Sequence, residues 1–430
     1  MVLRNLKIKW LLFRGKRERK RNRAAEAIRY FEQILAVDPQ RAIALAQIGC
    51  CLYDLQRYNE AIDAFQRALQ RAPNYADAHA HLAFVYMQLE RNQEAYDSIQ
   101  RALRMKPRLS DEPYWFYLLG YSSAKTGRWE EALATFRKMT ELAPNHVNAW
   151  HGLGWAYLNL DRNLEAVSAC ERARDLAPNS SATHYDLGLS YVKANRHREA
   201  VKEFKESLAL EPSNPNANYS LGLAYYDLAE FHMAIAPLQE ASRINPKAPE
   251  IFRTLGIVYG ELGQHQRARI AFQDAVRLNP DCSEYYCRLA ISCAQLGMRA
   301  EAIQAAEQAV RLNPESADAY LCLGCAFHAP ETFERAVAAY HHSLKLNPSQ
   351  FETLANLGDA YFELGRPEDA KKSLTQAEEI NSNDPKLHHL LGKVYLGLGD
   401  RGKASREYEI LRELDRSLAE EFEKLMSGPS

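Results

Sequence analysis

Prolines recur along this chain at a fixed spacing, and that spacing constrains the fold more than any other feature. Ten prolines define nine intervals, of which eight are 34 residues long and one is 37. They are Pro39, Pro73, Pro107, Pro144, Pro178, Pro212, Pro246, Pro280, Pro314 and Pro348. Such a period is the signature of an array of repeated units that pack on their neighbours. We therefore expect one array rather than the three or so globular domains that a chain of 430 residues would suggest.

Small residues keep the same register as the prolines. Phased on them, eleven full repeats begin at residues 42, 76, 113, 147, 181, 215, 249, 283, 317, 351 and 385. Alanine occupies position 20 in all eleven repeats, and glycine occupies position 8 in nine. Apolar residues at helical spacing predict two antiparallel helices per repeat, and facing small residues let two helix backbones approach closely.

Glycine and proline also mark where the predicted helices begin and end. Five repeats have glycine at position 15, which suits a left-handed turn after the first helix. The proline at position 32 ends the second helix, and four repeats have proline at position 1, where a helix tolerates the missing N–H. We expect two irregularities: an insertion within residues 108–112, and a first helix cut short by Pro330 in the ninth repeat.

These residues resemble the tetratricopeptide repeat (TPR) family. Its signature appears most fully as Trp150, Leu153, Gly154, Tyr157, Ala166, Ala173 and Pro178. The resemblance covers residues 42–416 and implies an all-α fold, an α-solenoid of tandem 34-residue helix-turn-helix repeats in a right-handed superhelix. It also implies a concave face built mainly from the first helix of each repeat.

The pattern divides the chain into four segments. Residues 1–23 form a basic N-terminal segment, residues 24–41 match the second half of a repeat, residues 42–416 hold the eleven TPR repeats, and residues 417–430 form a C-terminal capping helix and tail. The cap is predicted from an S-x-x-E capping box at Ser417 and Glu420. The apolar stripe of this helix consists of Leu418, Phe422 and Leu425.

Charge is distributed unevenly. The net charge of the chain is −1, but residues 1–23 contain ten basic side chains and one acidic side chain. Leu3, Leu6, Trp10 and Phe13 recur there at helical spacing, which would suit an anionic membrane surface or an acidic partner. The alternative is a solvated or degenerate terminal helix, and nucleic-acid binding is the weaker interpretation because the chain as a whole is not basic.

Several function classes are disfavoured by what the sequence lacks. It has no phosphate-binding loop, no G-x-S-x-G and no H-E-x-x-H, so we expect neither an enzyme nor a cofactor. No run of 18 apolar residues predicts a membrane span. Eight cysteines without a secretory leader favour reduced thiols and a cytoplasmic location, with a peripheral membrane position left open.

Helix geometry indicates which residues face the concave groove. Positions 4, 7, 8 and 11 of the first helix face the core, so positions 2, 6, 9 and 13 point away from it, flanked by positions 5 and 12. At these positions lie Tyr114, Tyr117, Tyr121, His151, Trp155, Tyr185, Tyr219 and Tyr226. Exposed aromatic residues favour peptide recognition. The alternative for Tyr117, Tyr185 and Tyr226, at the flanking positions, is packing between helices.

Two arginines and an acidic series lie on the same face. Arg253 and Arg288 would pair with a carboxylate of a bound peptide. The carboxylate clamp of the TPR family is not reproduced, because no repeat has lysine at position 5 together with asparagine at position 9. Acidic residues occupy position 2 of four successive repeats, which the helix dipole alone explains: Glu250, Glu284, Asp318 and Glu352.

Cysteines also gather on this face. Cys322 and Cys325 form a C-x-x-C, with His328 one turn further and Cys287 on the preceding first helix. We predict no metal site, since a second C-x-x-C is missing, but whether these four residues hold a metal ion is left open.

The sequence therefore predicts a non-enzymatic scaffold that binds partner peptides or helices in its groove. Two alternatives remain: a membrane-surface assembly or tethering factor anchored by residues 1–23, and a targeting subunit of a separately encoded enzyme.

Overall fold

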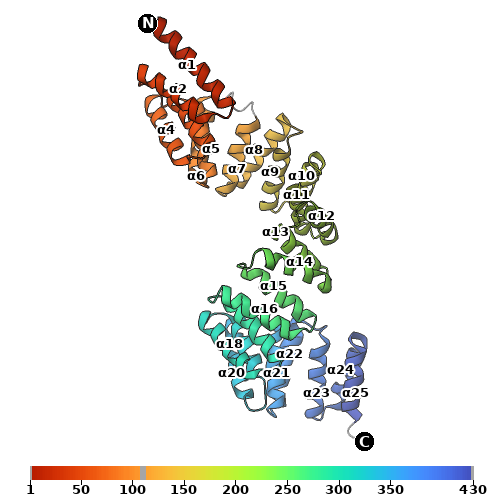
Figure 1. The fold of residues 1–430 in the computed structure, drawn as a ribbon. Helices are drawn as coiled ribbons and strands as arrows, with labels where there is room; N and C mark the ends of the chain where they lie inside the picture. The colour runs from red at the N-terminus through yellow and green to blue at the C-terminus, as the bar shows by residue number, and fades with distance from the viewer. Residues whose placement is uncertain (1, 107–112, 428–430) are drawn as a thin grey trace. The chain divides into compact units, whose positions relative to one another are not determined.

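The computed structural model describes residues 2–106 and 113–427, and within these ranges all regular structure is helical. The chain divides into two compact units, Met1–Pro212 and Ser213–Ser430. The first unit contains α1 (Val2–Lys20), α2 (Ala24–Val37), α3 (Ala42–Asp54), α4 (Tyr58–Arg71), α5 (Ala76–Gln88), α6 (Asn92–Met105), α7 (Pro113–Lys125), α8 (Trp129–Leu142), α9 (Val147–Asn159), α10 (Asn163–Leu176), α11 (Ser181–Lys193) and α12 (His197–Leu210) (Figure 1).

The second unit contains thirteen described helices. These are α13 (Pro215–Asp227), α14 (Phe231–Ile244), α15 (Pro249–Glu261), α16 (His265–Leu278), α17 (Ser283–Gln295), α18 (Arg299–Leu312), α19 (Ala317–Phe327), α20 (Phe333–Leu346), α21 (Phe351–Glu363), α22 (Pro367–Ile380), α23 (Pro385–Gly397), α24 (Arg401–Leu414) and α25 (Arg416–Ser427).

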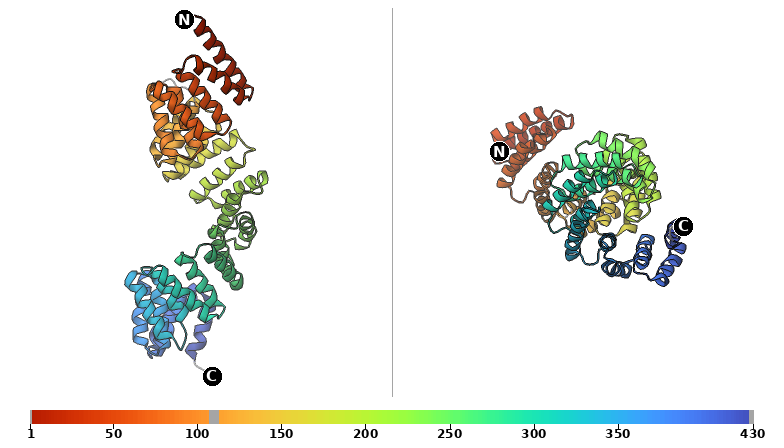
Figure 2. Two further views of the ribbon diagram at one scale, coloured as in Figure 1. Left: turned by 60° about the vertical axis from the view of Figure 1, so that its left-hand side comes forward. Right: turned by 90° about the horizontal axis from the view of Figure 1, so that it is seen from below.

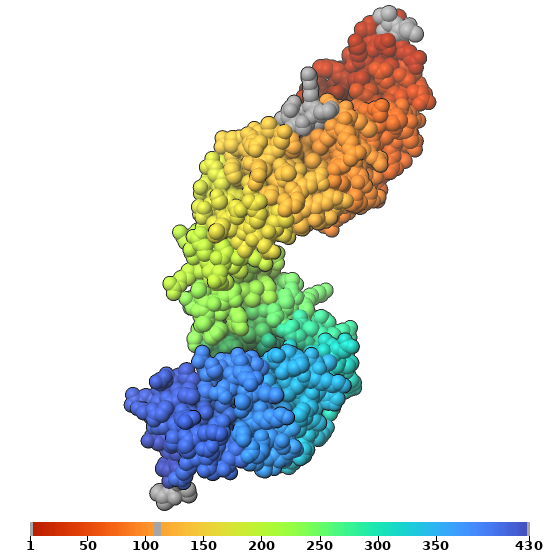
Figure 3. All heavy atoms as spheres, turned by 180° about the vertical axis from the view of Figure 1, so that it is seen from behind, coloured from red at the N-terminus to blue at the C-terminus, as the bar shows by residue number. Residues whose placement is uncertain are grey.

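Helices follow one another in pairs, and successive pairs stack within each unit (Figure 2). All eleven predicted repeat starts coincide with the first residue of a helix, from Ala42 of α3 to Pro385 of α23. In the space-filling view the colours follow the order of the chain within each unit, so each repeat lies beside its neighbours in sequence (Figure 3). The predicted all-α solenoid of TPR repeats is confirmed.

The small residues at positions 8 and 20 explain how closely the two helices of a repeat pack. Every alanine at position 20 is buried. At position 8 of α11, a Cβ added to Gly188 would come within 2.5 Å of the ring of Phe204 on α12. The same arrangement joins Gly120 to Phe136 and Gly256 to Phe272. Glycine is therefore required here because the aromatic side chain of the second helix occupies the space of its missing Cβ.

The turn after the first helix has a left-handed residue at position 15. All five predicted glycines have positive φ, from +68° at Gly263 to +77° at Gly127. Five further repeats place a residue with a side chain there, including Ala229 at φ 56°, and so does the first helix pair at Asn22. The ninth repeat departs from the pattern as expected, because α19 ends at Phe327, ahead of Pro330. The insertion at residues 108–112 lies outside the described residues.

The first helix pair extends the array at the N-terminal end. Most of residues 1–23 belongs to α1, which packs on α2 through Ile8, Leu11 and Gly15. Gly15 lies against the ring of Phe31, as position 8 does in the later repeats. The basic segment is thus the first helix of the repeat whose second helix lies in residues 24–41.

The last helix, α25, begins one residue earlier than predicted and has a different N-cap. The carboxylate of Asp415 accepts a hydrogen bond from the backbone N–H of Leu418 at 3.0 Å, so the cap is Asp415 and not Ser417. Phe422 is buried and Leu418 packs beside it, whereas Leu425 is exposed. The predicted apolar stripe is therefore wrong at Leu425.

Among the described helices, none has the length and the apolar character that crossing a lipid bilayer requires.

Candidate functional site

Aromatic side chains from three helices meet on the first unit. The ring centroids of Tyr121 on α7 and Trp155 on α9 lie 5.9 Å apart, and that of Trp129, the first residue of α8, lies 5.1 Å from Trp155 in an edge-on arrangement. Tyr117 lies one turn before Tyr121, with ring centroids 5.9 Å apart. Such offset and edge-on contacts fix the rings relative to one another.

A lysine completes this group. The Nζ atom of Lys125 lies 5.5 Å from the ring centroids of both Tyr121 and Trp155. We refer to Tyr117, Tyr121, Lys125, Trp129 and Trp155 as the Trp155 cluster. Its four rings are half-buried, so they are held by packing and still present area to solvent. Partly exposed aromatic rings beside a cation are the kind of group that is enriched at protein interfaces.

An ion pair lies next to the Trp155 cluster. His151, one turn before Trp155 on α9, has its Nε2 atom 2.7 Å from a carboxylate oxygen of Asp186 on α11. This hydrogen bond raises the pKa of His151 above its usual value, against the effect of burial. The pair joins the first helices of two adjacent repeats, so the predicted contact residue His151 also has a structural role.

The other predicted aromatics of the first unit, Tyr114 and Tyr185, also contact neighbouring rings, although Tyr114 remains 44% exposed. Tyr114 packs against Trp115, with ring centroids 4.9 Å apart, and against Phe84 at 5.8 Å. Tyr185 lies 5.9 Å from Phe204 of α12. Burial raises the pKa of both Tyr114 and Tyr117. These contacts favour the packing alternative for Tyr185.

Tyr219 and Tyr226 belong to the second unit. The hydroxyl of Tyr219 lies 3.2 Å from the hydroxyl of Thr254 on α15. The ring of Tyr226 packs against Phe231, the first residue of α14, at 5.7 Å. Both side chains therefore contribute to joining helices.

The two predicted arginines converge on one carboxylate. An Oε1 atom of Glu284 lies 3.4 Å from a guanidinium nitrogen of Arg253 and 4.0 Å from Nε of Arg288. Glu284 belongs to the acidic series at position 2. Its carboxylate occupies the place where a partner's carboxylate was expected, so these arginines would bind an acidic peptide only in competition with Glu284.

The cysteine and histidine residues at α17 and α19 separate into two groups. His328 lies 3.1 Å from both the Tyr340 hydroxyl and a carboxylate oxygen of Asp359, and the Tyr340 hydroxyl donates to Cys325 Sγ at 3.8 Å. Cys287 and Cys322 share a separate buried cluster. Within residues 2–106 and 113–427, no three His, Cys, Asp or Glu side chains are placed to hold a metal ion.

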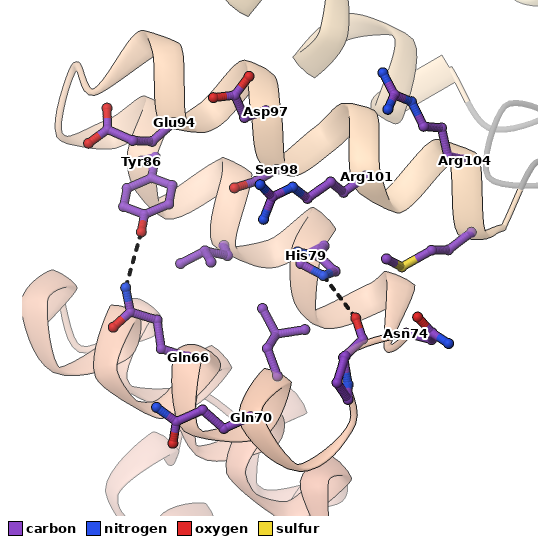
Figure 4. A pocket seen from close by; sticks show the side chains of 14 residues that line it. Gln66, Gln70, Asn74, His79, Tyr86, Glu94, Asp97, Ser98, Arg101 and Arg104 are labelled. Atoms are coloured by element: carbon purple, nitrogen blue, oxygen red, sulfur yellow. Dashed lines mark hydrogen bonds between the residues drawn. The ribbon is translucent and has the colours of Figure 1, made fainter.

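A cavity of about 870 Å³ lies between α4, α5 and α6 of the first unit (Figure 4). Gln66 donates to the Tyr86 hydroxyl at 3.4 Å across it, and His79 Nε2 lies 3.1 Å from the carbonyl of Pro73. Arg101 and Arg104 of α6 are among the residues that line it (Figure 4). The hydroxyl of Tyr86 and the ring of His79 are therefore engaged within the repeat frame.

The sequence did not single out Trp129, Lys125 or Asp186 as site residues. Lys125 lies at position 13, one of the positions expected to point outward, so the sequence could have identified it as a surface residue of this face. Trp129 lies at position 17 on the second helix, outside the positions considered. Asp186 lies at position 6 of its repeat, also an outward position.

Family models match along most of the chain. Models described as tetratricopeptide or TPR repeat match residues 14–76, 52–120, 117–181 and 188–228. A model described as the cilia and flagella-associated protein 70 C-terminal domain matches residues 213–424, which is nearly the whole second unit.

Solved structures show the same fold. A tetratricopeptide repeat protein from Parabacteroides merdae is similar at 17% identity with a TM-score of 0.52, covering 58% of this chain and 99% of that one. The structure of the APC/C hetero-tetramer Cut9–Hcn1 is similar at 16% identity with a TM-score of 0.51, covering 97% and 96%. No curated protein sequence matched the chain.

Proposed function

This chain belongs to the tetratricopeptide repeat family, and from that premise we propose that it is a non-enzymatic scaffold that binds partner proteins. We further propose that a peptide or helix of the partner contacts the first helices α7 and α9, with the Trp155 cluster as its anchor site. Curved repeat arrays commonly bind extended segments in this way.

The observation that carries the proposal is the arrangement of Tyr121, Trp129 and Trp155. Three rings from three helices are held by mutual contacts at 5.1–5.9 Å, and all three remain half-buried. Because the rings are already fixed, an incoming apolar side chain would gain contact area without the entropic cost of ordering them. Aromatic residues in such a setting dominate the binding free energy of many interfaces.

The chemistry of the cluster indicates the partner segment. The ring faces suit a leucine, phenylalanine or similar anchor, and Lys125 suits a carboxylate or a main-chain carbonyl beside that anchor. Similarity of residues 213–424 to a domain of cilia and flagella-associated protein 70 makes ciliary and flagellar proteins a first source of candidate partners.

Peptide display selected against the full-length protein tests this assignment. Selected peptides carrying a photo-crosslinker at the apolar anchor are expected to label α7, α8 or α9. Labels confined to other helices, with the same peptides binding a Tyr121→Ala, Trp155→Ala double variant equally well, would reject the Trp155 cluster as the contact surface.

Helix α1 favours a second candidate function, attachment to an anionic membrane surface. Leu3, Leu6, Trp10 and Phe13 lie on the face of α1 opposite Ile8 and Leu11, and are 52–83% exposed. Exposed basic residues flank this face: Lys7, Lys9, Lys16, Arg17 and Lys20. An apolar stripe bordered by cations is the pattern of helices that lie in a membrane interface.

Flotation with anionic liposomes tests the second candidate. A Leu6→Ser, Phe13→Ser double variant changes only exposed side chains, whereas removing residues 1–23 would uncover Phe31. We expect the wild type to float with phosphatidylserine-containing vesicles and the variant to remain in the soluble fraction. Equal flotation of the two proteins, or none with either, would reject membrane attachment through α1.

A further inference from the structure

Two cysteines from adjacent first helices meet in the second unit. Cys287 on α17 and Cys322 on α19 belong to one buried cluster, together with Ala309 and Ala319. Among the described pairs of neighbouring first helices, α17 and α19 make the most extensive contact. Small side chains allow this approach, because neither cysteine nor alanine extends far from the backbone.

The pair lines a cavity that opens on this face of the repeats. The cavity has a volume of about 520 Å³, and its walls include Ser283, Glu284, Arg288 and Asp318 as well as both cysteines. Each thiol is largely buried on its helix, but the cavity gives a small reagent a path to both sulfurs. Reactive cysteines need such access, whereas cysteines packed inside a core are inert.

The surroundings of the two thiols differ. The hydrogen bond with Cys322 lowers the pKa of Cys287 against the effects of burial and of the Asp318 charge, and a hydrogen bond with Ser283 and the charge of Arg288 act in the lowering direction. The pKa of Cys322 is raised, first by its role as donor to Cys287 and then by burial. Arg288 directly follows Cys287 on α17, whereas Asp318 lies one turn before Cys322 on α19, and both charged residues line the cavity. Because a neighbouring cation favours a thiolate and a neighbouring carboxylate disfavours one, Cys287 is the better placed nucleophile, with Cys322 beside it as the second thiol.

We propose that Cys287 and Cys322 form a reversible disulfide by exchange with a small disulfide such as oxidised glutathione. The proposal concerns the second unit and is independent of the proposed function of the Trp155 cluster. It assigns Cys287 as the attacking thiol and Cys322 as the resolving thiol.

The exchange proceeds in two balanced steps. The Cys287 thiolate attacks one sulfur of oxidised glutathione, whose S–S bond breaks and releases one glutathione thiolate. Cys322 then loses its proton, and its thiolate attacks Cys287 Sγ in the mixed disulfide and releases the second glutathione thiolate. The two thiolates released take up the protons lost by the two cysteines, so two protein thiols are oxidised and one small disulfide is reduced to two thiols.

The bond would join two repeats at the wall of the cavity. It would cross-link α17 to α19 around the intervening helix α18, and so prevent the two first helices from separating. It would also fix Arg288, adjacent to Cys287, relative to Asp318 on α19. A ligand that requires the cavity to widen would therefore bind only the reduced protein.

Mass spectrometry of the full chain in glutathione buffers of graded redox state tests the proposal. We expect a Cys287–Cys322 disulfide in wild type, with the number of free thiols falling from eight to six. A Cys322→Ser variant is expected to retain glutathione on Cys287, and a Cys287→Ser variant to leave Cys322 free. A Cys293→Ser variant, altered at a buried cysteine of the same helix, is the matched control and is expected to behave as wild type.

Alkylation of the native wild-type protein provides a measurement that needs no variant. Cys287 is expected to react with N-ethylmaleimide faster than Cys322. The proposal is overturned if both thiols stay reduced in fully oxidised glutathione, if Cys322 captures glutathione in the Cys287→Ser variant, or if alkylation proceeds faster at Cys322.

Discussion

Gly392 lies against the ring of Phe422, a residue of α25 and not of the second helix of its own repeat. In earlier repeats the glycine at position 8 meets a side chain of its paired helix, as Gly256 meets Phe272. In the last repeat the capping helix supplies the ring that fills this space. The terminal repeat therefore depends on α25 for a contact that the other repeats form internally.

Replacing Phe422 by alanine is expected to destabilise the last repeat. The ring is fully buried, and deleting a buried phenylalanine side chain costs about 3–5 kcal/mol in folded proteins. Hydrogen exchange should show faster exchange in α23–α25 while the first unit is unchanged. Leu425→Ala, on the exposed side of the same helix, is the control, and equal effects of the two changes would contradict this account of the cap.

Replacing each of two glycines of α15 by alanine should change the stability of the protein in opposite directions. A Cβ on Gly256 would come within 2.6 Å of the Phe272 ring, whereas a Cβ on Gly260 has no neighbour within 4 Å. We expect Gly256→Ala to lose about 1–3 kcal/mol through overpacking. Gly260→Ala should gain about 0.5–1 kcal/mol because alanine restricts the unfolded chain and favours a helix. Denaturation midpoints measure both, and a midpoint for Gly256→Ala at or above that of the wild type would refute the packing argument.

The repeat frame was predictable from sequence because its determinants are local. Each helix start depends on the proline and glycine positions and on the apolar period, so all eleven starts were predicted to the residue. The contacts of long side chains were not predictable in this way. Arg253 and Arg288 were expected to be available to a partner. The pairing of Arg288 with Glu284, four residues earlier on the same helix, follows from spacing alone, but the pairing of Arg253 with Glu284 depends on how adjacent repeats are offset.

Trp129 shows the same limit for the candidate site. Its position on the second helix gave no reason to place it beside Trp155, since that contact depends on how neighbouring repeats pack. The cap at Asp415 was missed for a different reason: two residues able to cap lie close together, and only the geometry distinguishes them.

Glycine should be more stable than alanine at a position 15 that adopts the left-handed conformation. Ala229 adopts φ 56° despite its Cβ, while Gly263 in the next repeat adopts φ 68°. We expect Ala229→Gly to raise stability by about 0.5–1 kcal/mol and Gly263→Ala to lower it by about 1 kcal/mol. The midpoints of thermal denaturation of the two variants, each compared with that of the wild type, measure these changes in stability. A loss of stability in Ala229→Gly would mean that backbone entropy outweighs the strain.

His388 should make the stability of the second unit depend on pH. Its Nδ1 lies 2.7 Å from a carboxylate oxygen of Glu407 and its Nε2 lies 2.8 Å from the carbonyl of Ser382, so both ring nitrogens face acceptors. The hydrogen bond to Glu407 raises the pKa of His388. The contribution of His388 to the free energy of unfolding is therefore fully present below about pH 6.5, the pKa of histidine in the unfolded chain. It is lost as the pH rises through the higher pKa of His388 in the folded protein.

His79 provides a control of opposite sign. Burial lowers the pKa of His79, so its contribution to stability should fall as the pH drops through the pKa that histidine has in the unfolded chain. Urea denaturation midpoints of wild type, His388→Leu and His79→Leu are measured between about pH 5.5 and 8.5. As pH rises, the difference in stability between wild type and His388→Leu should shrink, and the difference between wild type and His79→Leu should grow. The same trend for both residues would contradict the assigned pKa directions.

The most direct test of the central claim is the affinity of one display-selected peptide for wild type and for Trp155→Ala, measured by isothermal titration calorimetry. Loss of an aromatic anchor should weaken binding by about 30-fold, the factor that corresponds to about 2 kcal/mol. Leu164→Ala, an exposed change on α10, should leave the affinity unchanged. Unaltered affinity in a folded Trp155→Ala protein would contradict the assignment of the Trp155 cluster as the partner-binding surface.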